Sequence, residues 1–126
     1  MIQWIAVAAG GALGATLRHA VNQIALQALG ADFPWGTLAV NILGSFIMGV
    51  FVGAFALFWD ASQTLRLFLT VGVLGGFTTF SAFSLDSVLL LQRGQVIEAV
   101  SYILGSVILS LGGLVAGMML VRMVPA

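Results

Sequence analysis

Four long apolar stretches, separated by short polar links, make up almost the whole chain. A helix that crosses a lipid bilayer needs roughly 20 mostly apolar residues. Each stretch meets that requirement, so the sequence predicts an all-α integral membrane protein with four transmembrane helices. They form one domain, residues 1–126, and the predicted spans are residues 2–29, 35–59, 67–91 and 99–121.

Charged residues account for only 6% of the chain, and all four basic residues are arginines. A soluble domain carries about a quarter charged residues, so this protein needs lipid around most of its surface. Four acids, one histidine and no cysteine exclude a disulfide and offer no metal cluster or nucleophile–base set. The composition therefore argues against an enzyme, and the lack of a basic patch argues against a nucleic-acid partner. The N-terminus has no positively charged segment, so no cleaved signal peptide is expected.

The four arginines divide evenly between the two sides of the predicted membrane. Arg66 and Arg122 are expected on the side of the N-terminus, and Arg18 and Arg93 toward the other side. The positive-inside rule then gives no preferred orientation. Two interpretations stay open at this point. Either the chain is weakly biased and oriented by a partner or by its N-terminus, or it inserts both ways and pairs as an antiparallel dimer.

Glycines four residues apart recur in three of the predicted spans, and such pairs let helices approach closely. The pairs are Gly10/Gly14, Gly49/Gly53 and Gly113/Gly117. They predict tight packing without specifying a partner. Four helices are also few for a pore within one chain, which favours an oligomer.

Polar side chains recur at every fourth position in two spans, and this spacing places them on one helical face. They are Thr37, Asn41 and Ser45 in the second span and Tyr102, Ser106 and Ser110 in the fourth. Inside a bilayer, such faces contact protein or water. Hydrogen bonding between helices is one interpretation, and a polar pathway is the other. The stripes contain donors and no acid, which suits an anion better than a cation.

The third span combines a glycine cluster, Gly72 to Gly76, with the pair Thr78-Thr79 near its middle. Glycine costs about 1 kcal/mol relative to alanine inside a helix, so a break is predicted here, with an unbroken close-packing helix as the alternative. Broken helices commonly bind ions through freed carbonyls and half-helix ends. After the break, Phe80 and Phe83 share a face. Aromatic side chains usually serve packing, but their positive ring edges also offer the weak anion contacts that conduction requires.

Three motifs, in this order and spacing, carry a family resemblance. They are Gly10-Gly11-Ala12-Leu13-Gly14-Ala15 leading to Leu17-Arg18, then Trp35-Gly36-Thr37-Leu38 with Asn41, then Gly75-Gly76-Phe77-Thr78-Thr79-Phe80-Ser81 with Phe83-Ser84. With them the chain resembles the Fluc/CrcB family of small fluoride channels along essentially its whole length. The resemblance implies a multi-pass protein of the bacterial inner membrane that passively exports fluoride and so relieves fluoride toxicity. It also implies a dual-topology antiparallel homodimer with two pores, each using both subunits.

The resemblance further implies roles for individual residues. Backbone carbonyls of Gly75 and Thr78 are expected to hold a central structural Na⁺ at the dimer interface. Phe80 and Phe83 are expected to turn their ring edges toward fluoride, with Asn41 as a donor in the pore. The remaining residues expected along the pore are Arg18, Thr37, Ser81, Tyr102, Ser106 and Ser110.

One position departs from the family pattern, which usually reads Phe-Ser-Thr-Phe-Ser where this chain has Ala82 between Ser81 and Phe83. The missing hydroxyl puts the normal conduction rate in doubt without affecting the fold. Two alternatives to a channel are a proton-coupled multidrug-type exporter and a structural membrane subunit. The exporter needs a carboxylate deep in the membrane, but the first span has no acid and Asp86 lies near the end of the third.

Overall fold

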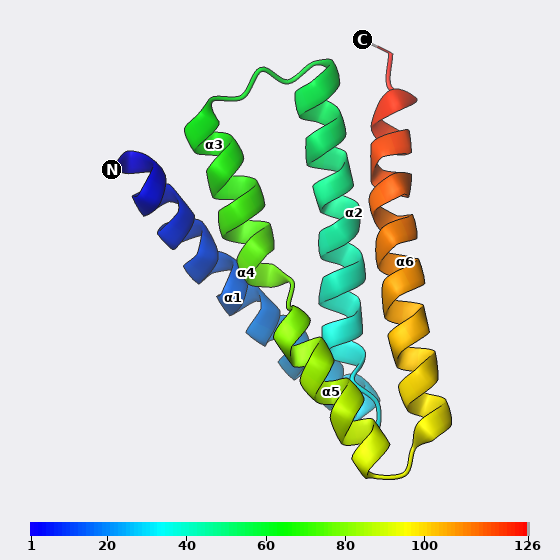
Figure 1. The fold of residues 1–126 in the computed structure, drawn as a ribbon. Helices are drawn as coiled ribbons and strands as arrows, with labels where there is room; N and C mark the ends of the chain where they lie inside the picture. Colours follow the sequence, from blue (N-terminus) through cyan, green and yellow to red (C-terminus); the bar gives the residue numbers. More distant parts are fainter. Residues whose placement is uncertain (126) are drawn as a thin grey trace.

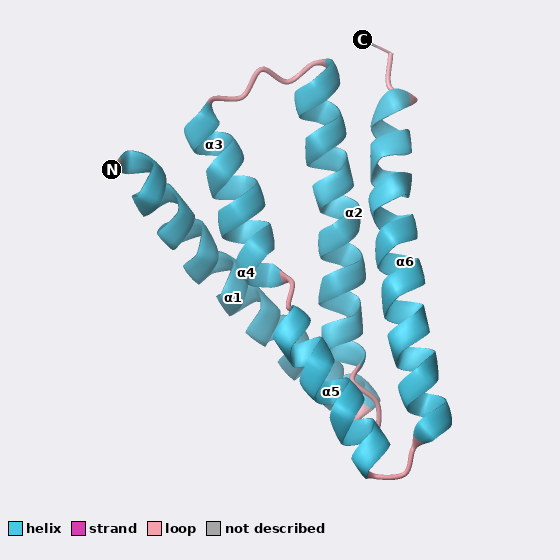
Figure 2. Ribbon diagram, viewed as in Figure 1, coloured by secondary structure: helices cyan, strands magenta, loops and turns pink. Residues whose placement is uncertain are grey.

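The protein forms a bundle of four helical passes with short turns between them (Figures 1 and 2). The structure is a computed structural model that describes residues 1–125, in which every regular element is a helix. The elements are α1 (Ile2–Leu29), α2 (Trp35–Leu57), α3 (Gln63–Leu67), the π-helix η1 (Phe68–Leu74), α4 (Gly75–Phe77), α5 (Phe80–Gln92) and α6 (Val96–Arg122). Segments α3 to α5 together make the third pass. Both ends of the described chain and the α2–α3 connection lie at one end of the bundle (Figure 1).

The four predicted helices are present, and three of these passes are long and apolar enough to cross a bilayer: α2, the run from Gln63 to Gln92, and α6. Helix α1 has 28 residues, which is ample length. Its second half, however, contains Arg18, His19 and Asn22, which lower its apolar character. The first pass is therefore established as a helix, and its crossing of the membrane stays a prediction.

The predicted glycine pairs lie where helices touch. A Cβ at Gly49 would overlap the carbonyl oxygen of Leu114, and one at Gly117 would overlap that of Phe46, so α2 and α6 pack backbone against backbone. On the other side of the bundle, a Cβ at Gly10 would lie 2.6 Å from the carbonyl oxygen of Phe68. Helix α1 is thereby pressed against η1 and α4. These contacts confirm the close packing predicted from the spacing.

The third pass is interrupted at Thr78 and Thr79, as the glycine and threonine cluster predicts (Figure 1). Thr78 has φ −86° and ψ 161°, and Thr79 has φ −154° and ψ 121°, so two residues are extended between α4 and α5. The alternative of an unbroken helix is wrong. The π-helical turns of η1, which lead into the break, were not predicted from the residue pattern.

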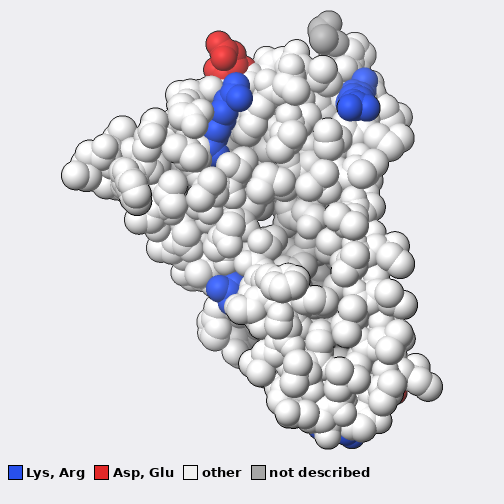
Figure 3. Space-filling model, in the orientation of Figure 1, with Lys and Arg blue, Asp and Glu red and all other residues white. Residues whose placement is uncertain are grey.

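Charged side chains gather at the two ends of the bundle, with one small basic spot between them and a broad uncharged surface elsewhere on this face (Figure 3). Arg66 lies in α3 at the end that holds the termini, and Arg122 is the last residue of α6. Arg93 follows α5 in the turn at the opposite end. Arg18 bonds to the α4 end of the break, so it lies at the level of the break, short of the far end of α1.

Candidate functional site

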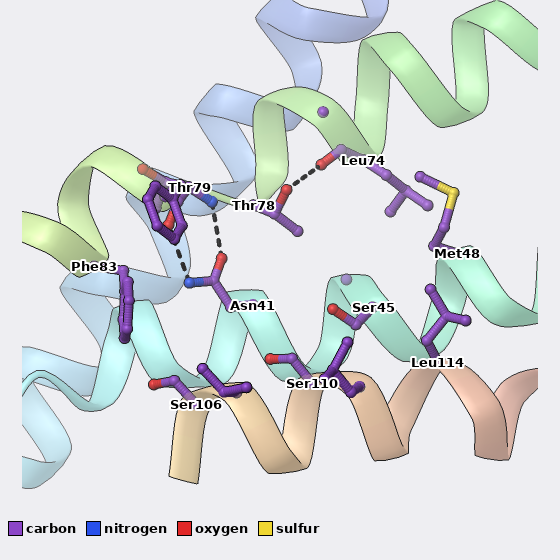
Figure 4. Close-up of a pocket in the computed structure, with 15 residues that line it drawn as sticks. Asn41, Ser45, Met48, Leu74, Thr78, Thr79, Phe83, Ser106, Ser110 and Leu114 are labelled. Atoms are coloured by element: carbon purple, nitrogen blue, oxygen red, sulfur yellow. Dashed lines mark hydrogen bonds between the residues drawn. The ribbon is translucent and has the colours of Figure 1, made fainter. Parts of the chain in front are cut away.

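A cavity of about 390 Å³ lies between α2, the broken third pass and α6 (Figure 4). The polar side chains that line it are all neutral: Asn41, Ser45, Thr78, Thr79, Ser106 and Ser110. The backbone of Gly75 and the rings of Phe80 and Phe83 complete the wall nearest the break. The cavity therefore unites residues of both predicted polar stripes with the break and the two phenylalanines.

Asn41 bridges α2 to the break through both ends of its side-chain amide. Its Nδ2 donates to the carbonyl oxygen of Thr79 at 3.0 Å, and its Oδ1 accepts from the Thr79 backbone N–H at 2.8 Å (Figure 4). The amide thus satisfies both backbone groups of an extended residue, as a neighbouring β-strand would. Nδ2 carries a second N–H, which is the only donor that Asn41 retains for a ligand.

The hydroxyl groups of the break also bond to the backbone. Thr79 Oγ1 accepts from the N–H of Ala82 at 3.1 Å and so caps the start of α5. Thr78 Oγ1 donates to the carbonyl oxygen of Leu74 at 3.0 Å, which closes the end of α4. Ser81 is exposed, and its Oγ lies 3.3 Å from Thr79 Oγ1. Ser81 therefore belongs to the cap of α5 and does not line the cavity.

Ser106 and Ser110 line the α6 side of the cavity, and their hydroxyl groups are not bonded to the backbone of the described chain. Their Oγ atoms are buried, yet neither has a hydrogen-bond partner within residues 1–125. Serines in helices usually bond to their own backbone, as Ser87 does to Phe83 at 2.8 Å. An unpaired buried hydroxyl costs about 1–3 kcal/mol. Two such groups on one wall of a cavity indicate a position where a polar ligand or water supplies the missing partner.

The phenylalanines of α5 belong to a chain of aromatic contacts. The ring centroids of Phe80 and Phe83 are 5.5 Å apart, and those of Phe83 and Tyr102 are 5.4 Å apart. Phe80 is 78% exposed in the single chain, whereas Phe83 packs against the buried core around Leu90. Phe80 therefore turns most of its ring away from its own chain.

Tyr102 does not continue the Ser106 and Ser110 track into the cavity. It is fully buried, and its hydroxyl donates to Oδ2 of Asp86 in α5 at 3.1 Å. The stripe predicted on one face of α6 is therefore divided. Its two serines line the cavity, and its tyrosine joins the core between α5 and α6.

Thr37 and Ala82 lie at a second cavity of about 360 Å³, which also contacts Asp86, Arg93 and Trp35. The second-span stripe is likewise divided, since Asn41 and Ser45 line the first cavity and Thr37 the second. Sequence reasoning placed position 82 within one pore-lining segment together with the phenylalanines. The structure places its methyl group toward a different cavity.

Arg18 reaches the break from α1. Its Nε donates to the carbonyl oxygen of Gly76 at 3.0 Å. A guanidinium at this point offsets the negative end of the α4 peptide dipoles. The charge of Arg18 therefore lies beside the broken helix.

Sequence reasoning treated Thr79 as part of a helix breaker and assigned it no site role. A signal was present, because threonine directly before the first turn of a helix is a favoured N-cap residue, whose side-chain oxygen accepts from an N–H two or three positions later. Ser45 was seen in the polar stripe but not counted among the site residues, and it lines the cavity.

Comparison with known proteins fits this site. Residues 5–118 match the family model described as "CrcB-like protein, Camphor Resistance (CrcB)". The chain is 53% identical over 122 residues to the fluoride-specific ion channel FluC of Rhizobium johnstonii, covering 97% of this chain and 98% of the relative. It is 50% identical over 120 residues to FluC of Nitrobacter winogradskyi, covering 95% of each chain. It is also 52% identical over 118 residues to FluC 1 of Nitrobacter hamburgensis, covering 94% of each.

These relatives are named as ion channels, so the family is one of transporters and not of enzymes. The family and the apolar helices together make this a multi-pass protein of the bacterial inner membrane. Matching almost from end to end, the chain belongs to the CrcB-like family, that of the FluC fluoride channels.

Proposed function

We propose that this protein is a fluoride-selective channel that lets F⁻ leave the cytoplasm passively and so relieves fluoride toxicity. The observation that carries the proposal is the cavity at the break, where unpartnered buried hydroxyls of Ser106 and Ser110 lie near Asn41 and the phenylalanine rings. Fluoride is small and strongly hydrated, so a pore must replace its water with closely spaced donors. The neutral donors of this cavity meet that need without holding the ion too firmly to leave.

The direction of flow follows from the chemistry of hydrogen fluoride. The weak acid crosses the bilayer as HF, ionises at the neutral pH of the cytoplasm and is trapped there as F⁻. A membrane potential that is negative inside then drives the anion outward through an open channel. No nucleotide or proton coupling is needed, which agrees with an α1 that has no acid and an Asp86 that is bonded to Tyr102.

The working unit that we propose is an antiparallel homodimer of chains inserted in both directions, with two pores that each use both subunits. Arginines occur at both ends of the bundle, with Arg66 and Arg122 at one end and Arg93 at the other, and this weak charge bias supports insertion both ways. Phe80 turns a 78% exposed ring away from its own chain, which leaves its face for a second copy. In such a dimer Phe80 and Phe83 direct ring edges at fluoride, and Asn41 offers its remaining N–H. Thr37, Ser81 and Tyr102, which lie outside the cavity of the single chain, border the rest of the path. Arg18 contributes positive charge beside the break.

We also propose that carbonyl oxygens of Gly75 and Thr78 hold a structural Na⁺ at the dimer interface. The donor set fits the ion, because neutral oxygen ligands suit hard cations and both residues line the cavity. Neither carbonyl accepts a hydrogen bond from any group in residues 1–125, although each lies at the broken end of a helix. When bound, such an ion supplies positive charge between the two pores. The residues of this chain supply the break, the cap of α5 and the arginine beside it.

The first test is anion efflux from liposomes that contain the purified protein, with fluoride and chloride followed by ion-selective electrodes. We expect rapid release of fluoride while chloride is retained. Release of both anions would contradict selectivity. If neither anion moves, Ala82→Thr should be assayed next, because it restores the hydroxyl common in the family. If Ala82→Thr also releases neither anion, the result would favour a structural membrane subunit over a channel.

Replacing Ser106 with alanine should separate conduction from stability. The Ser106 hydroxyl has no partner within residues 1–125, so its removal costs no hydrogen bond and relieves an unpaired buried group. We expect Ser106→Ala to lower fluoride efflux while the thermal unfolding midpoint is unchanged or higher. Ser87→Ala is the matched control, because its hydroxyl bonds to Phe83. A Ser106→Ala variant with normal efflux would remove this hydroxyl from the path.

A further inference from the structure

The break in the third pass is kept open by two side chains that take hydrogen-bond donors away from the helix. In an uninterrupted α-helix, each backbone N–H donates to the carbonyl four residues earlier. The N–H of Thr79 would then donate to Gly75, and the N–H of Ala82 would donate to Thr78. In the structure, the first N–H donates to Asn41 Oδ1 at 2.8 Å and the second to Thr79 Oγ1 at 3.1 Å.

The two carbonyls released by this exchange are those of Gly75 and Thr78. Both residues line the cavity, and neither carbonyl accepts a hydrogen bond within residues 1–125. Two other carbonyls at the break do have partners: the Gly76 carbonyl accepts from Arg18, and the Thr79 carbonyl accepts from Asn41. For both free carbonyls, the N–H that an unbroken helix would supply is held by a side chain instead.

We propose that Asn41 and Thr79 are positioning residues that hold the Gly75 and Thr78 carbonyls free for a monovalent cation. Asn41 accepts from the Thr79 N–H, which would otherwise donate to the Gly75 carbonyl. The Thr79 hydroxyl accepts from the Ala82 N–H, which would otherwise donate to the Thr78 carbonyl. Because Asn41 also borders the fluoride path, it joins the cation site to the pore. The inference rests on the cation ligation put forward under Proposed function.

The ligand chemistry follows from the surroundings of these carbonyls. Every side chain that lines the cavity is neutral. A divalent ion without carboxylate ligands would bring two uncompensated charges into a low-dielectric region. A monovalent hard cation such as Na⁺ suits neutral carbonyl oxygens better.

Isotope labelling can observe both sides of the exchange in the unmodified protein. Thr78-Thr79 is the only Thr-Thr pair in the chain. Threonine labelled with ¹³C at the carbonyl and ¹⁵N at the amide therefore yields a single directly bonded ¹³C–¹⁵N pair, the Thr78 carbonyl and the Thr79 nitrogen. Solid-state NMR of the protein in liposomes should show the Thr78 carbonyl signal moving when Na⁺ is replaced by N-methyl-D-glucamine. The Thr79 amide should resist deuterium exchange in both salts, because its partner is Asn41. A Thr78 signal that ignores Na⁺, or a Thr79 amide that exchanges freely, would overturn the proposal.

Variants test whether the side chains act on the cation. Loss of a group that orients a metal ligand typically lowers metal affinity by about 10–100-fold. We expect Thr79→Val and Asn41→Ala to raise, by that factor, the Na⁺ concentration needed for half of the Na⁺-induced rise in the thermal unfolding midpoint. In Thr79→Ser, this concentration should equal that of the wild type. Thr70→Val is the control, since it removes a hydroxyl bond to Arg66 within the same pass but away from the break. Equal Na⁺ dependence in all four variants would refute the assignment.

The same samples keep this inference separate from the proposed function. Fluoride efflux by a protein whose unfolding midpoint and Thr78 carbonyl are indifferent to Na⁺ would leave the channel intact and reject the positioning role. Absence of fluoride efflux with a Na⁺-sensitive Thr78 carbonyl would reject the channel and leave the positioning role intact.

Discussion

Phe83→Ile is expected to reduce fluoride efflux from liposomes at least tenfold while the protein remains folded. The ring of Phe83 lies between those of Phe80 and Tyr102, with centroid distances of 5.5 and 5.4 Å, and lines the cavity at the break. Isoleucine preserves most of the apolar volume but has no aromatic edge. If the positive edge of the ring contacts the ion, its loss raises the barrier, and about 1.4 kcal/mol corresponds to a tenfold slower step.

The matched control for this substitution is Phe51→Ile. Phe51 stacks on Phe55 with a centroid distance of 6.0 Å and does not line the cavity. The two variants make the same chemical change, so efflux should fall only in Phe83→Ile, and both should elute as the wild type does in size-exclusion chromatography. Phe80→Ile should behave like Phe83→Ile. Normal efflux in both cavity variants would eliminate the ring edges as ion contacts.

The helical architecture was predictable because its signals are local. Runs of apolar residues of bilayer length locate the passes, and the glycine pairs identify the faces that touch, as Gly49 and Gly117 do. The break was also predictable, since glycines and β-branched threonines destabilise a helix wherever they occur. The structure adds its position, at Thr78 and Thr79.

The division of the polar stripes was not predictable from spacing. Periodicity states which residues share a helical face, but not what each level of that face meets. The side chain of Tyr102 is long and, like every helical side chain, leans toward the N-terminus of its helix. Its hydroxyl therefore reaches Asp86 in α5, beside the turn that begins α6, while Ser106 one turn later faces the cavity.

The second role of Asn41 was hidden for a related reason. A polar residue on an apolar helix predicts a polar environment, but it does not say whether the partner is an ion or an irregular backbone. The unpaired backbone groups of Thr79 exist only because the third pass breaks, and α2 brings Asn41 to them from 38 residues away in the sequence. Only the three-dimensional arrangement reveals that one amide satisfies both groups.

Gly14→Ala is expected to destabilise the protein strongly. A Cβ at position 14 would overlap the backbone carbonyl oxygen of Val73 in η1 and lie 2.9 Å from the backbone nitrogen of Phe77. Backbone atoms cannot rotate away as a flexible side chain can. Overpacking typically costs about 1–3 kcal/mol, and we expect the upper part of that range. The measurement is the thermal unfolding midpoint in detergent, together with fluoride efflux, because displaced α4 residues lie next to the break.

Gly11→Ala provides the contrast within the same helix and the same glycine motif. A Cβ at position 11 would meet no atom of residues 1–125 within 4 Å, and alanine is favoured over glycine inside a helix by about 1 kcal/mol. The midpoint of this variant should therefore equal or exceed that of the wild type, although the substitution differs from Gly14→Ala by less than one helical turn. Equal losses in both variants would mean that the glycines serve α1 itself or a contact with a second chain. A loss confined to Gly14 would establish that the contact of α1 with η1 holds the broken pass in place, and so fixes the position of the Gly76 carbonyl that Arg18 must reach.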